Sequence, residues 1–335
     1  MGAKIWFRAF MIVVLLICGA SVVLVPIPAS AAQSGWAAIT PGGSTICARG
    51  TPYSFYVRQG DPSRLLIYFQ GGGMCWDANT CAANSGLFDE NTAPEDPVSY
   101  GAGIFASSPE NPVANHTAVF VAYCTGDLHV GDSVQQYADD LTIYHNGFNN
   151  AAAALRWTVS NYPAASEVVI SGCSAGAYAS IYYAPAIARR YSGARITQLG
   201  DSGAGALPPS WGGLNVWNAF AHSPSGQRAA NEFNTSLYAE AASRYPRAVF
   251  AQYTTIGDEV QQFYKRPDGR LELLGDIAAS FDALETRTNF RSYLAPGGEH
   301  CITPTPRFYT EIVDGVRFVD WFAALINRGE AANVG

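Results

Sequence analysis

The chain has 335 residues, of which 48% are hydrophobic and 14% are charged, which excludes an intrinsically disordered protein and allows a substantial core. The formal net charge of −7 and a pI near 5.2 argue against a nucleic-acid partner, because phosphate binding needs a concentrated basic face. Length alone allows one large domain or two of medium size.

The first 32 residues have the pattern of a secretory signal peptide. Lys4 and Arg8 precede an apolar run at residues 10–25, and the small residues at 29–31 suit cleavage directly after them. A membrane anchor is the alternative, but the run is short for a span and prolines follow it closely. We therefore expect a secreted, extracellular protein with no stable membrane anchor after cleavage. Losing two basic and no acidic residues moves its net charge from −7 to about −9.

After this segment, β-rich runs alternate with helix-forming stretches. The first two runs are predicted to form a strand pair joined by the Gly60-Asp61-Pro62 turn. The predicted strands cover residues 53–58, 64–69, 117–123, 167–170, 195–199, 248–255 and 290–294, and the predicted helices cover 139–159, 175–191, 276–285 and 309–327. This alternation predicts an α/β fold with a mostly parallel central sheet and helices on both faces.

Two segments interrupt the alternation. Residues 77–115 are polar and rich in Gly, Pro and Asn, and residues 203–245 carry Trp211, Trp217 and Phe220. We expect both to form a cap or loop excursion at the carboxyl end of the sheet, where α/β proteins build their sites. Because we find no internal repeat and no long low-complexity linker, we expect residues 33–335 to form a single domain. We expect the protein to be a monomer.

The segment Gly172-Cys173-Ser174-Ala175-Gly176 fits the G-x-S-x-G pattern of a nucleophile turn in an α/β-hydrolase fold. A buried-looking strand precedes it and a helix-forming stretch follows it, as such a turn requires. The glycines allow a sharp turn that lifts the Ser174 hydroxyl above the sheet and leaves the Ala175 N–H free for a developing oxyanion. The alternative, an incidental serine in a glycine-rich turn, is disfavoured by this context.

A second glycine motif, Gln70 followed by glycines at 71–73, ends the predicted strand RLLIYF. The α/β-hydrolases place their second oxyanion donor at this point in the chain, often in a HGGG-type motif. We therefore assign Gly72 and Gly73, together with Ala175, as oxyanion donors. A plain glycine turn or a phosphate-binding loop is the alternative, but the Gly-Lys-Ser/Thr of a P-loop does not follow.

The catalytic base follows the nucleophile in the α/β-hydrolase order Ser, Asp, His, and only His222 and His300 do so. His300 lies in a loop directly after the last predicted strand, from which its imidazole can reach the serine, whereas His222 lies in the predicted cap. We therefore predict His300 as the base.

The acid is expected after the preceding strand at residues 248–255. Asp258 fits this position and could hold the His300 imidazole in the right tautomer. Asp201 and then Glu259 are the alternatives, and each carboxylate could instead be a helix cap or part of a strand-end turn.

The segment Gly200-Asp201-Ser202-Gly203 mimics the nucleophile signature of chymotrypsin-like proteases. Those enzymes need a histidine and an aspartate upstream in an all-β double barrel. The long predicted helices contradict that fold, so we reject this interpretation.

Six cysteines remain after signal cleavage, and their even number in an exported chain indicates disulfides. Metal binding is disfavoured because the chain has no C-x-x-C and no histidine at zinc-ligand spacing from a cysteine pair. We expect no metal and no cofactor.

Taken together, these motifs resemble the pectin acetylesterase family, to which Notum-type carboxylesterases also belong. The resemblance covers roughly residues 47–301, most of the mature chain, and its combination of motifs is far more specific than any one of them. It rests on CARGTPYSFYV from Cys47, the glycines with Cys75 and Cys81, Tyr123-Cys124, the serine motif, Asp201-Ser202-Gly203, GDEVQ from Gly257, and His300.

The resemblance implies ester hydrolysis by a Ser174, Asp258 and His300 triad, with Gly72, Gly73 and Ala175 as oxyanion hole. The disulfides that fit it are Cys75–Cys81, Cys47–Cys124 and Cys173–Cys301. The chain departs from the family pattern at Gln70, where Glu is common, at Met74, where Trp is common, and at Ala177, where plant members have Gly. We expect Met74 and Ala177 to lie near the pocket, so these departures bear on the acyl chain that is accepted.

The resemblance points first to O-acetyl esters on a carbohydrate polymer such as pectin. A lipid acyl ester or a polyester is an alternative substrate. A catalytically inactive binding module on the same fold is an alternative of another class, which the retained triad residues and glycines disfavour.

Overall fold

The computed structural model of the protein describes residues 35–335 except 206, 208–210, 224–225, 228, 266–272 and 329–330. The predicted signal peptide at residues 1–32 lies outside the described residues. Within the described ranges, no helix combines the length and hydrophobicity that crossing a bilayer requires.

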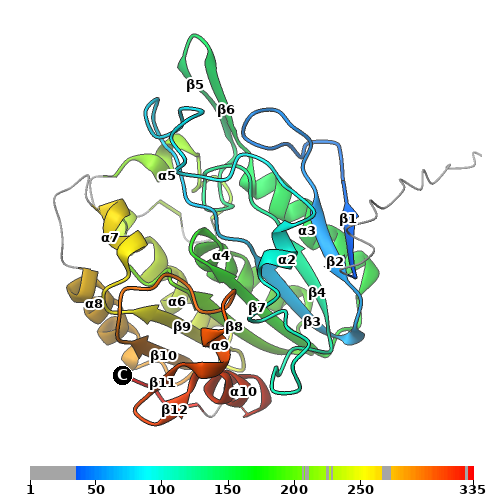
Figure 1. Ribbon diagram of the computed structural model, residues 1–335, viewed down its shortest axis with the longest axis vertical. Helices are drawn as coiled ribbons and strands as arrows, with labels where there is room; N and C mark the ends of the chain where they lie inside the picture. The colour runs from blue at the N-terminus through cyan, green and yellow to red at the C-terminus, as the bar shows by residue number, and fades with distance from the viewer. Residues whose placement is uncertain are drawn as a thin grey trace, which may run out of the picture.

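Eight strands of the described chain form one central sheet (Figure 1). They are β1 (Trp36–Ile39), β2 (Phe55–Arg58), β3 (Asp61–Phe69), β4 (His116–Val121), β7 (Glu167–Cys173), β8 (Arg195–Asp201), β9 (Val249–Thr255) and β10 (Phe290–Ala295). Their order is β1-β2-β4-β3-β7-β8-β9-β10. Only the β1–β2 and β2–β4 pairs are antiparallel, which confirms the predicted mostly parallel sheet.

Helices cover both faces of this sheet, and shorter ones lie in the loops that connect its strands. The helices of the described chain are α2 (Asp96–Ser99), α3 (Gly147–Asn161), α4 (Ala175–Arg190), α5 (Gly213–Val216), α6 (Phe233–Arg244), α7 (Glu259–Lys265), α8 (Leu273–Glu285), α9 (Arg307–Thr310) and α10 (Phe318–Arg328). On one face, Gln198 of β8 donates hydrogen bonds to Ser180 of α4 and Tyr238 of α6. On the other face, Tyr253 of β9 packs edge-on against Phe318 of α10, with ring centroids 5.1 Å apart. In the β8–β9 pairing, Gln198 lies opposite the residue three positions before Tyr253. Because successive side chains along a strand point to alternate faces of the sheet, the side chains of Gln198 and Tyr253 point to opposite faces.

The predicted pairing of the first two strands is wrong. β4 lies between β2 and β3, pairing antiparallel with β2 and parallel with β3. Every residue of β4 is buried, so this strand is stable only with a neighbour on each side. The short segment at Gly60 therefore connects β2 to β3 past the intervening strand β4 and does not close a hairpin. The Gly60 N–H donates a hydrogen bond to the hydroxyl group of Thr117 in β4.

The predicted helix at residues 139–159 begins too early. Asp139 and Asp140 form the turn of a hairpin between β5 (Ser133–Ala138) and β6 (Leu141–His145), which projects from the top of the molecule in Figure 1. The alternating, β-branched sequence LTIYH favours a strand over a helix. The helix itself, α3, starts only after Asn146.

The predicted helix at residues 309–327 is interrupted. A small hairpin of β11 (Ile312–Val313) and β12 (Val316–Arg317) separates α9 from α10. Its turn residues Asp314 and Gly315 have φ values of 49° and 77°, which a continuous right-handed helix does not tolerate.

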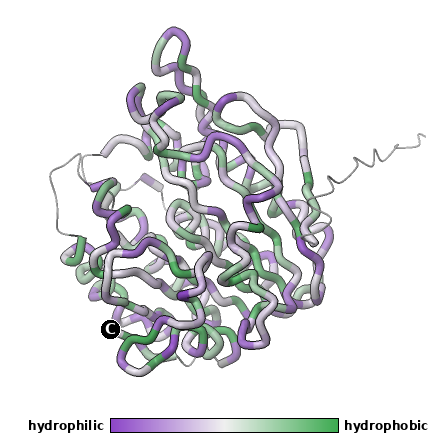
Figure 2. Tube along the Cα trace, viewed as in Figure 1, coloured by the Kyte–Doolittle hydropathy of each residue, from purple (hydrophilic) through white to green (hydrophobic). Residues whose placement is uncertain are grey.

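The two predicted excursions contain short elements of their own, namely α2 in residues 77–115 and α5 and α6 in residues 203–245. The sequence did not reveal the edge strand β1 or the helix α7. Figure 2 shows that hydrophobic residues follow the central strands, whereas much of the outer loop surface is hydrophilic.

An ionic cluster holds four strands of the sheet together at the amino end of β7. The Glu167 carboxylate lies 2.9 Å from the Arg64 guanidinium of β3 and 2.8 Å from the His116 imidazole of β4, and it also pairs with Arg195 of β8. Burial alone would raise the pKa of Glu167. Hydrogen bonds from these three side chains outweigh burial and lower the pKa to about 2.

Candidate active site

Ser174 stands between the end of β7 and the start of α4, as the motif predicts. Its backbone has φ 57° and ψ −121°, a strained conformation for a residue with a side chain. The two motif glycines make the turn possible because a Cβ on Gly176 would lie 2.0 Å from the Phe69 carbonyl oxygen, and one on Gly172 would lie 2.3 Å from that of Gly176. The Ser174 N–H donates to the Asp201 carbonyl at 2.8 Å, which fixes the turn to β8.

The structure brings His300 and Asp258 into direct contact. The Nδ1 of His300 lies 2.9 Å and 2.8 Å from the two carboxylate oxygens of Asp258. Asp258 is fully buried, and it also accepts hydrogen bonds from the backbone of Val260 and Gln261 and from the Gln261 side chain. The Nε2 of His300 is buried and has no hydrogen-bond partner among the described residues.

A disulfide joins the chain neighbours of Ser174 and His300. Cys173 and Cys301 are bonded, with their Cα atoms 5.8 Å apart. One ring nitrogen of His300 lies within 4.8 Å of both sulfur atoms. The serine turn and the histidine loop are therefore side by side, with Nε2 of His300 available for a hydroxyl group.

Asp201, the first alternative acid, has a different partner. Its buried carboxylate accepts hydrogen bonds from the backbone N–H groups of Ile302 and Thr303 and from the Thr303 hydroxyl. Burial raises the pKa of Asp201, although these hydrogen bonds oppose the shift. Its neighbour Ser202 accepts the Cys301 N–H at 2.9 Å. Asp201 thus fixes the loop that carries His300 without touching the imidazole.

The remaining alternatives lie elsewhere. His222 stacks on Phe148 with ring centroids 3.7 Å apart, and its Nε2 contacts Asp132 at 2.8 Å. Glu259 begins α7 and bonds through its backbone N–H to Gly298. Of the candidate acids, only Asp258 forms a hydrogen bond with His300.

The glycine loop after β3 approaches the serine turn closely. Gly73 has φ 71°, and a Cβ on it would lie 1.9 Å from the Leu87 carbonyl oxygen, so no other residue fits. The N–H groups of Gly72 and Gly73 have no acceptor among the described residues, and Ala175 opens α4, where the first N–H groups have no intrahelical acceptor. These three residues carry the predicted oxyanion donors.

Two cavities of different size and chemistry meet at Ser174 and His300. The smaller has a volume of about 40 Å³ and a mainly apolar wall, whose larger hydrophobic members are Met74, Leu128, Tyr178, Leu207, Val260 and Tyr264. Lys265 also lines it and pairs with Asp276. The larger is an open cleft of about 350 Å³ bordered by the glycine loop, by residues 86–89 and by Tyr100.

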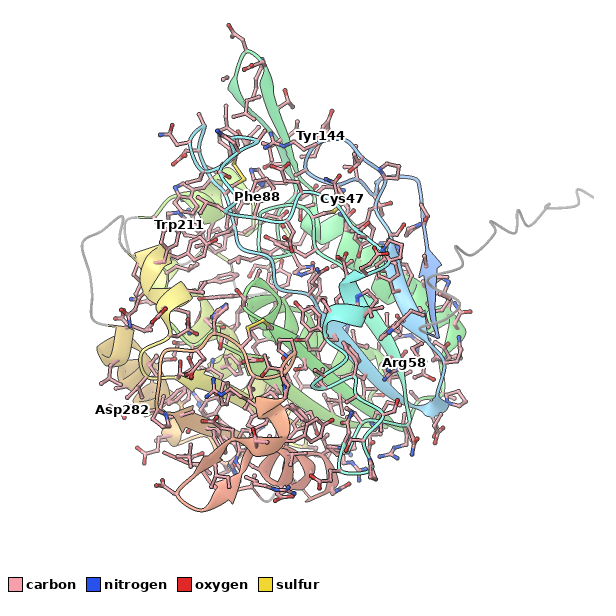
Figure 3. The ribbon with its side chains drawn as sticks, viewed as in Figure 1. Cys47, Arg58, Phe88, Tyr144, Trp211 and Asp282 are labelled. Atoms are coloured by element: carbon pink, nitrogen blue, oxygen red, sulfur yellow. A yellow bond between two sulfur atoms is a disulfide. The ribbon has the colours of Figure 1, made fainter. Side chains whose placement is uncertain are left out.

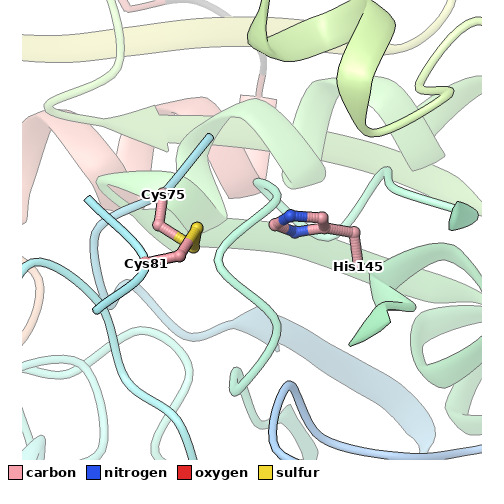
Figure 4. Close-up of side chains that lie close together, drawn as sticks. All are labelled: Cys75, Cys81 and His145. Carbon is pink, nitrogen blue, oxygen red and sulfur yellow. A yellow bond between two sulfur atoms is a disulfide. The ribbon is translucent and has the colours of Figure 1, made fainter. Parts of the chain in front are cut away.

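The other disulfides are Cys47–Cys124 and Cys75–Cys81, so the structure contains the three pairs that the family resemblance implies. The second lies beside His145, as Figure 4 shows. Both sulfur atoms are already bonded to each other, so no thiolate is left for a metal ion. The His145 ring instead contacts the Thr125 carbonyl and the Tyr137 hydroxyl, and burial lowers its pKa to about 4.

The departures from the family pattern have different environments. Met74 lines the small cavity, as expected, whereas Ala177 does not, because it packs behind the serine turn against Gly203. Gln70 accepts the Tyr123 N–H at 2.9 Å. No sequence motif singles out Asp89, which enters the cleft because Phe88 pairs with Gly73 in an isolated β-bridge.

The fold and this site define the class of the protein. A mostly parallel sheet, a serine at a strand–helix turn and an imidazole–carboxylate pair beside it are the arrangement of α/β-hydrolase enzymes. More specifically, the family model described as pectinacetylesterase matches residues 39–255, and the chain belongs to this family. Membership indicates a carboxylic ester hydrolase.

Curated relatives align over shorter segments. The zebrafish (Danio rerio) protein named inactive palmitoleoyl-protein carboxylesterase notum1b is 32% identical over 102 residues, which are 28% of this chain and 72% of the relative. Zebrafish palmitoleoyl-protein carboxylesterase notum1a is 31% identical over 104 residues, covering 29% and 20%. Mouse (Mus musculus) palmitoleoyl-protein carboxylesterase NOTUM is 30% identical over 95 residues, covering 27% and 19%. The chain thus matches about a fifth of the length of the last two.

Proposed function

We propose that the protein is a secreted serine carboxylesterase that removes acetyl groups from a carbohydrate polymer. In this proposal Ser174 is the nucleophile, His300 the general base and Asp258 the acid that orients it. The three disulfides and the signal-like leader support an oxidising, extracellular location.

The proposed reaction has two steps. The Asp258 carboxylate accepts the Nδ1–H of His300, which leaves Nε2 unprotonated and able to take the Ser174 proton as the oxygen attacks the ester carbonyl. The alcohol leaves with that proton from His300, and a water activated by the same imidazole hydrolyses the acyl-enzyme. The free N–H groups of Gly72, Gly73 and Ala175 would stabilise the oxyanion, each contributing about 3 kcal/mol to lowering the barrier.

The pair of cavities is the observation that supports an acetyl ester most directly. A cavity with a volume of about 10–15 Å³ holds one water molecule. The small cavity, at about 40 Å³, therefore has room for a group of acetyl size. The larger cleft is open and partly polar, which suits a sugar chain on the alcohol side of the ester.

The alternatives fit less well. A long lipid acyl chain needs several times the volume of the small cavity, so the activity named for the mouse relative is not the one we propose here. A non-catalytic binding module is suggested by the relative named inactive. Against it, this chain keeps the serine turn, the His300–Asp258 contact and the unpaired glycine amides together.

The test measures acetate release from acetylated pectin and acetylated xylan, alongside hydrolysis of nitrophenyl acetate and nitrophenyl palmitate. We expect acetate from at least one polymer, strong preference for the acetate ester, and almost complete loss of all activity in Ser174→Ala. Activity retained by Ser174→Ala would refute the mechanism, and efficient palmitate hydrolysis would refute the acyl assignment. A correctly folded wild type inert to both nitrophenyl esters would favour the binding module.

A further inference from the structure

Asp89 places a carboxylate in the alcohol-side cleft, directly against the glycine loop. Its backbone N–H donates to the Gly72 carbonyl at 2.9 Å, and its Oδ2 is so close to Gly72 that a Cβ there would lie 2.5 Å from it. The side chain is exposed to the cleft that Ser174 and His300 also line. Its carboxylate has no hydrogen-bond or ion-pair partner among the described residues.

No cation neutralises this group from the described walls of the cleft. The other ionisable side chains that line the cleft are Tyr100, Tyr264 and His300. Asp96 of α2 lies close enough to influence Asp89. Asp89 is open to solvent on its cleft side, but partial desolvation where it packs against the glycine loop, followed by this second negative charge, raises its pKa to about 6. Above that pH, the cleft presents a negative charge to whatever alcohol the ester carries.

The basic side chains nearest to this region are already paired. Arg49 forms an ion pair with Glu90, the residue after Asp89, at 2.6 Å. Lys265 lies in the wall of the small cavity and pairs with Asp276. A carboxylate on the substrate would therefore meet Asp89 without a described counter-charge.

We propose that Asp89 is a specificity-determining residue that makes the enzyme prefer acetyl esters on uncharged sugar units over acetyl esters on uronate units. This inference rests on the proposed function, and it narrows the alcohol side of the substrate. The carboxylate can accept hydrogen bonds from sugar hydroxyl groups, which a neutral glycan supplies, whereas a uronate at the same place adds like-charge repulsion in a partly desolvated cleft.

One polymer backbone in two charge states tests this directly. Acetylated galacturonan with free carboxylates is acidic, and the same polymer with methyl-esterified carboxyls is neutral, so the ratio of kcat/KM for acetate release isolates the charge. At pH 7.5 we expect the wild-type neutral-to-acidic ratio to be about tenfold or more. Asp89→Asn should bring the ratio close to one.

The pH dependence of the ratio gives a second reading that a merely structural role for Asp89 would not produce. Uronate stays ionised at pH 5 because its pKa is about 3.5, like that of an α-carboxyl group. Asp89 becomes mostly protonated there, so the wild-type ratio should fall between pH 7.5 and pH 5, while that of Asp89→Asn should stay flat. Both polymers use the same catalytic base, so its contribution to the two rates cancels in the ratio. If Asp89→Asn does not fold, this wild-type profile still tests the proposal.

Asp282→Asn is the matched control. Asp282 is an exposed residue of α8, labelled in Figure 3, and it lines neither cavity. The substitution removes the same charge as Asp89→Asn does, so the neutral-to-acidic ratio of kcat/KM should equal that of the wild type. Three results would overturn the inference. They are a neutral-to-acidic ratio in Asp89→Asn that equals that of the wild type, a change of the ratio in Asp282→Asn as large as that in Asp89→Asn, and a wild-type ratio below one. Failure of the wild type to release acetate from either polymer and from nitrophenyl acetate would instead overturn the proposed function.

Discussion

Two buried aspartates near His300 should respond very differently to the same substitution. Asp258 contacts the imidazole with both carboxylate oxygens. The carboxylate of Asp201 instead accepts hydrogen bonds from the backbone and hydroxyl groups that follow His300 and from the hydroxyl of its neighbour Ser202. Asp258→Asn and Asp201→Asn each replace one oxygen by an NH2 group and remove one negative charge. The comparison separates an acid that orients the base from a carboxylate that holds the loop.

For Asp258→Asn, the fold should survive and catalysis should not. An asparagine NH2 facing Nδ1 favours the tautomer in which Nδ1 accepts and Nε2 carries the proton, and that Nε2 cannot take the proton of Ser174. The same substitution in a serine protease triad lowers kcat about 10⁴-fold, and we expect a loss of similar size.

For Asp201→Asn, stability should fall first. The carboxylate accepts three close hydrogen bonds from Ile302 and Thr303, and an amide leaves one or two of these donors facing another donor. At about 1.5–3 kcal/mol for each lost hydrogen bond to a charged group, the expected loss is about 1.5–6 kcal/mol in the free energy of unfolding. The loop would then shift by a fraction of an ångström, and kcat of the folded fraction should fall less than about 10²-fold.

Urea unfolding and the kcat for nitrophenyl acetate, corrected for the folded fraction, are the measurements. The reasoning is refuted if Asp258→Asn keeps near wild-type kcat, or if a fully stable Asp201→Asn loses activity about 10⁴-fold. The first outcome would mean that Asp258 does not orient the base, and the second would mean that Asp201 does.

Two further perturbations act on the scaffold. Glu167 has a lower pKa in the folded protein than in the unfolded chain, so it stabilises the fold above pH 4.5, and this contribution of at most about 3 kcal/mol is lost as the pH falls toward 2. In Glu167→Gln, the free energy of unfolding measured with urea should therefore fall less steeply between pH 4.5 and pH 2 than in the wild type. An equally steep fall would contradict this. Replacing both Cys173 and Cys301 by Ala opens a loop of 128 residues and should cost about 4–5 kcal/mol of stability and lower kcat, whereas an unaltered melting temperature would show that the disulfide does not restrain the fold.

The sequence predicted those parts of the fold that depend on local patterns. Continuous apolar runs such as residues 168–170 became central parallel strands because a strand buried on both faces carries mostly hydrophobic residues. The order of the strands was not predictable in this way. β4 lies beside β3 because β4 must be buried between two neighbours, although it is distant in sequence from β2 and β3. Residues 53–69 alone do not indicate this pairing.

The candidate site shows the same division. The serine turn, Gly72–Gly73 and His300 each belong to a motif whose local geometry can be inferred from a few adjacent residues. Asp89 belongs to no motif. It reaches the cleft because a distant loop pairs with Gly73, and cavity size likewise depends on how side chains from separate loops pack.

Two different restraints, one of hydrogen bonds and one covalent, hold the serine turn and the histidine loop at one spacing. Asp201 accepts the Ser174 N–H with its backbone carbonyl and the loop N–H groups with its carboxylate, and the Cys173–Cys301 bond links the same two segments covalently. Because both restraints act on one loop, removing the disulfide should displace His300 less when Asp201 is intact than when Asp201 is already substituted. Substitutions at Asp201 and at the disulfide should therefore be non-additive in kcat, with a coupling of about 0.5–3 kcal/mol. Strict additivity would mean that the two restraints hold different parts of the loop, so that neither alone determines the position of His300.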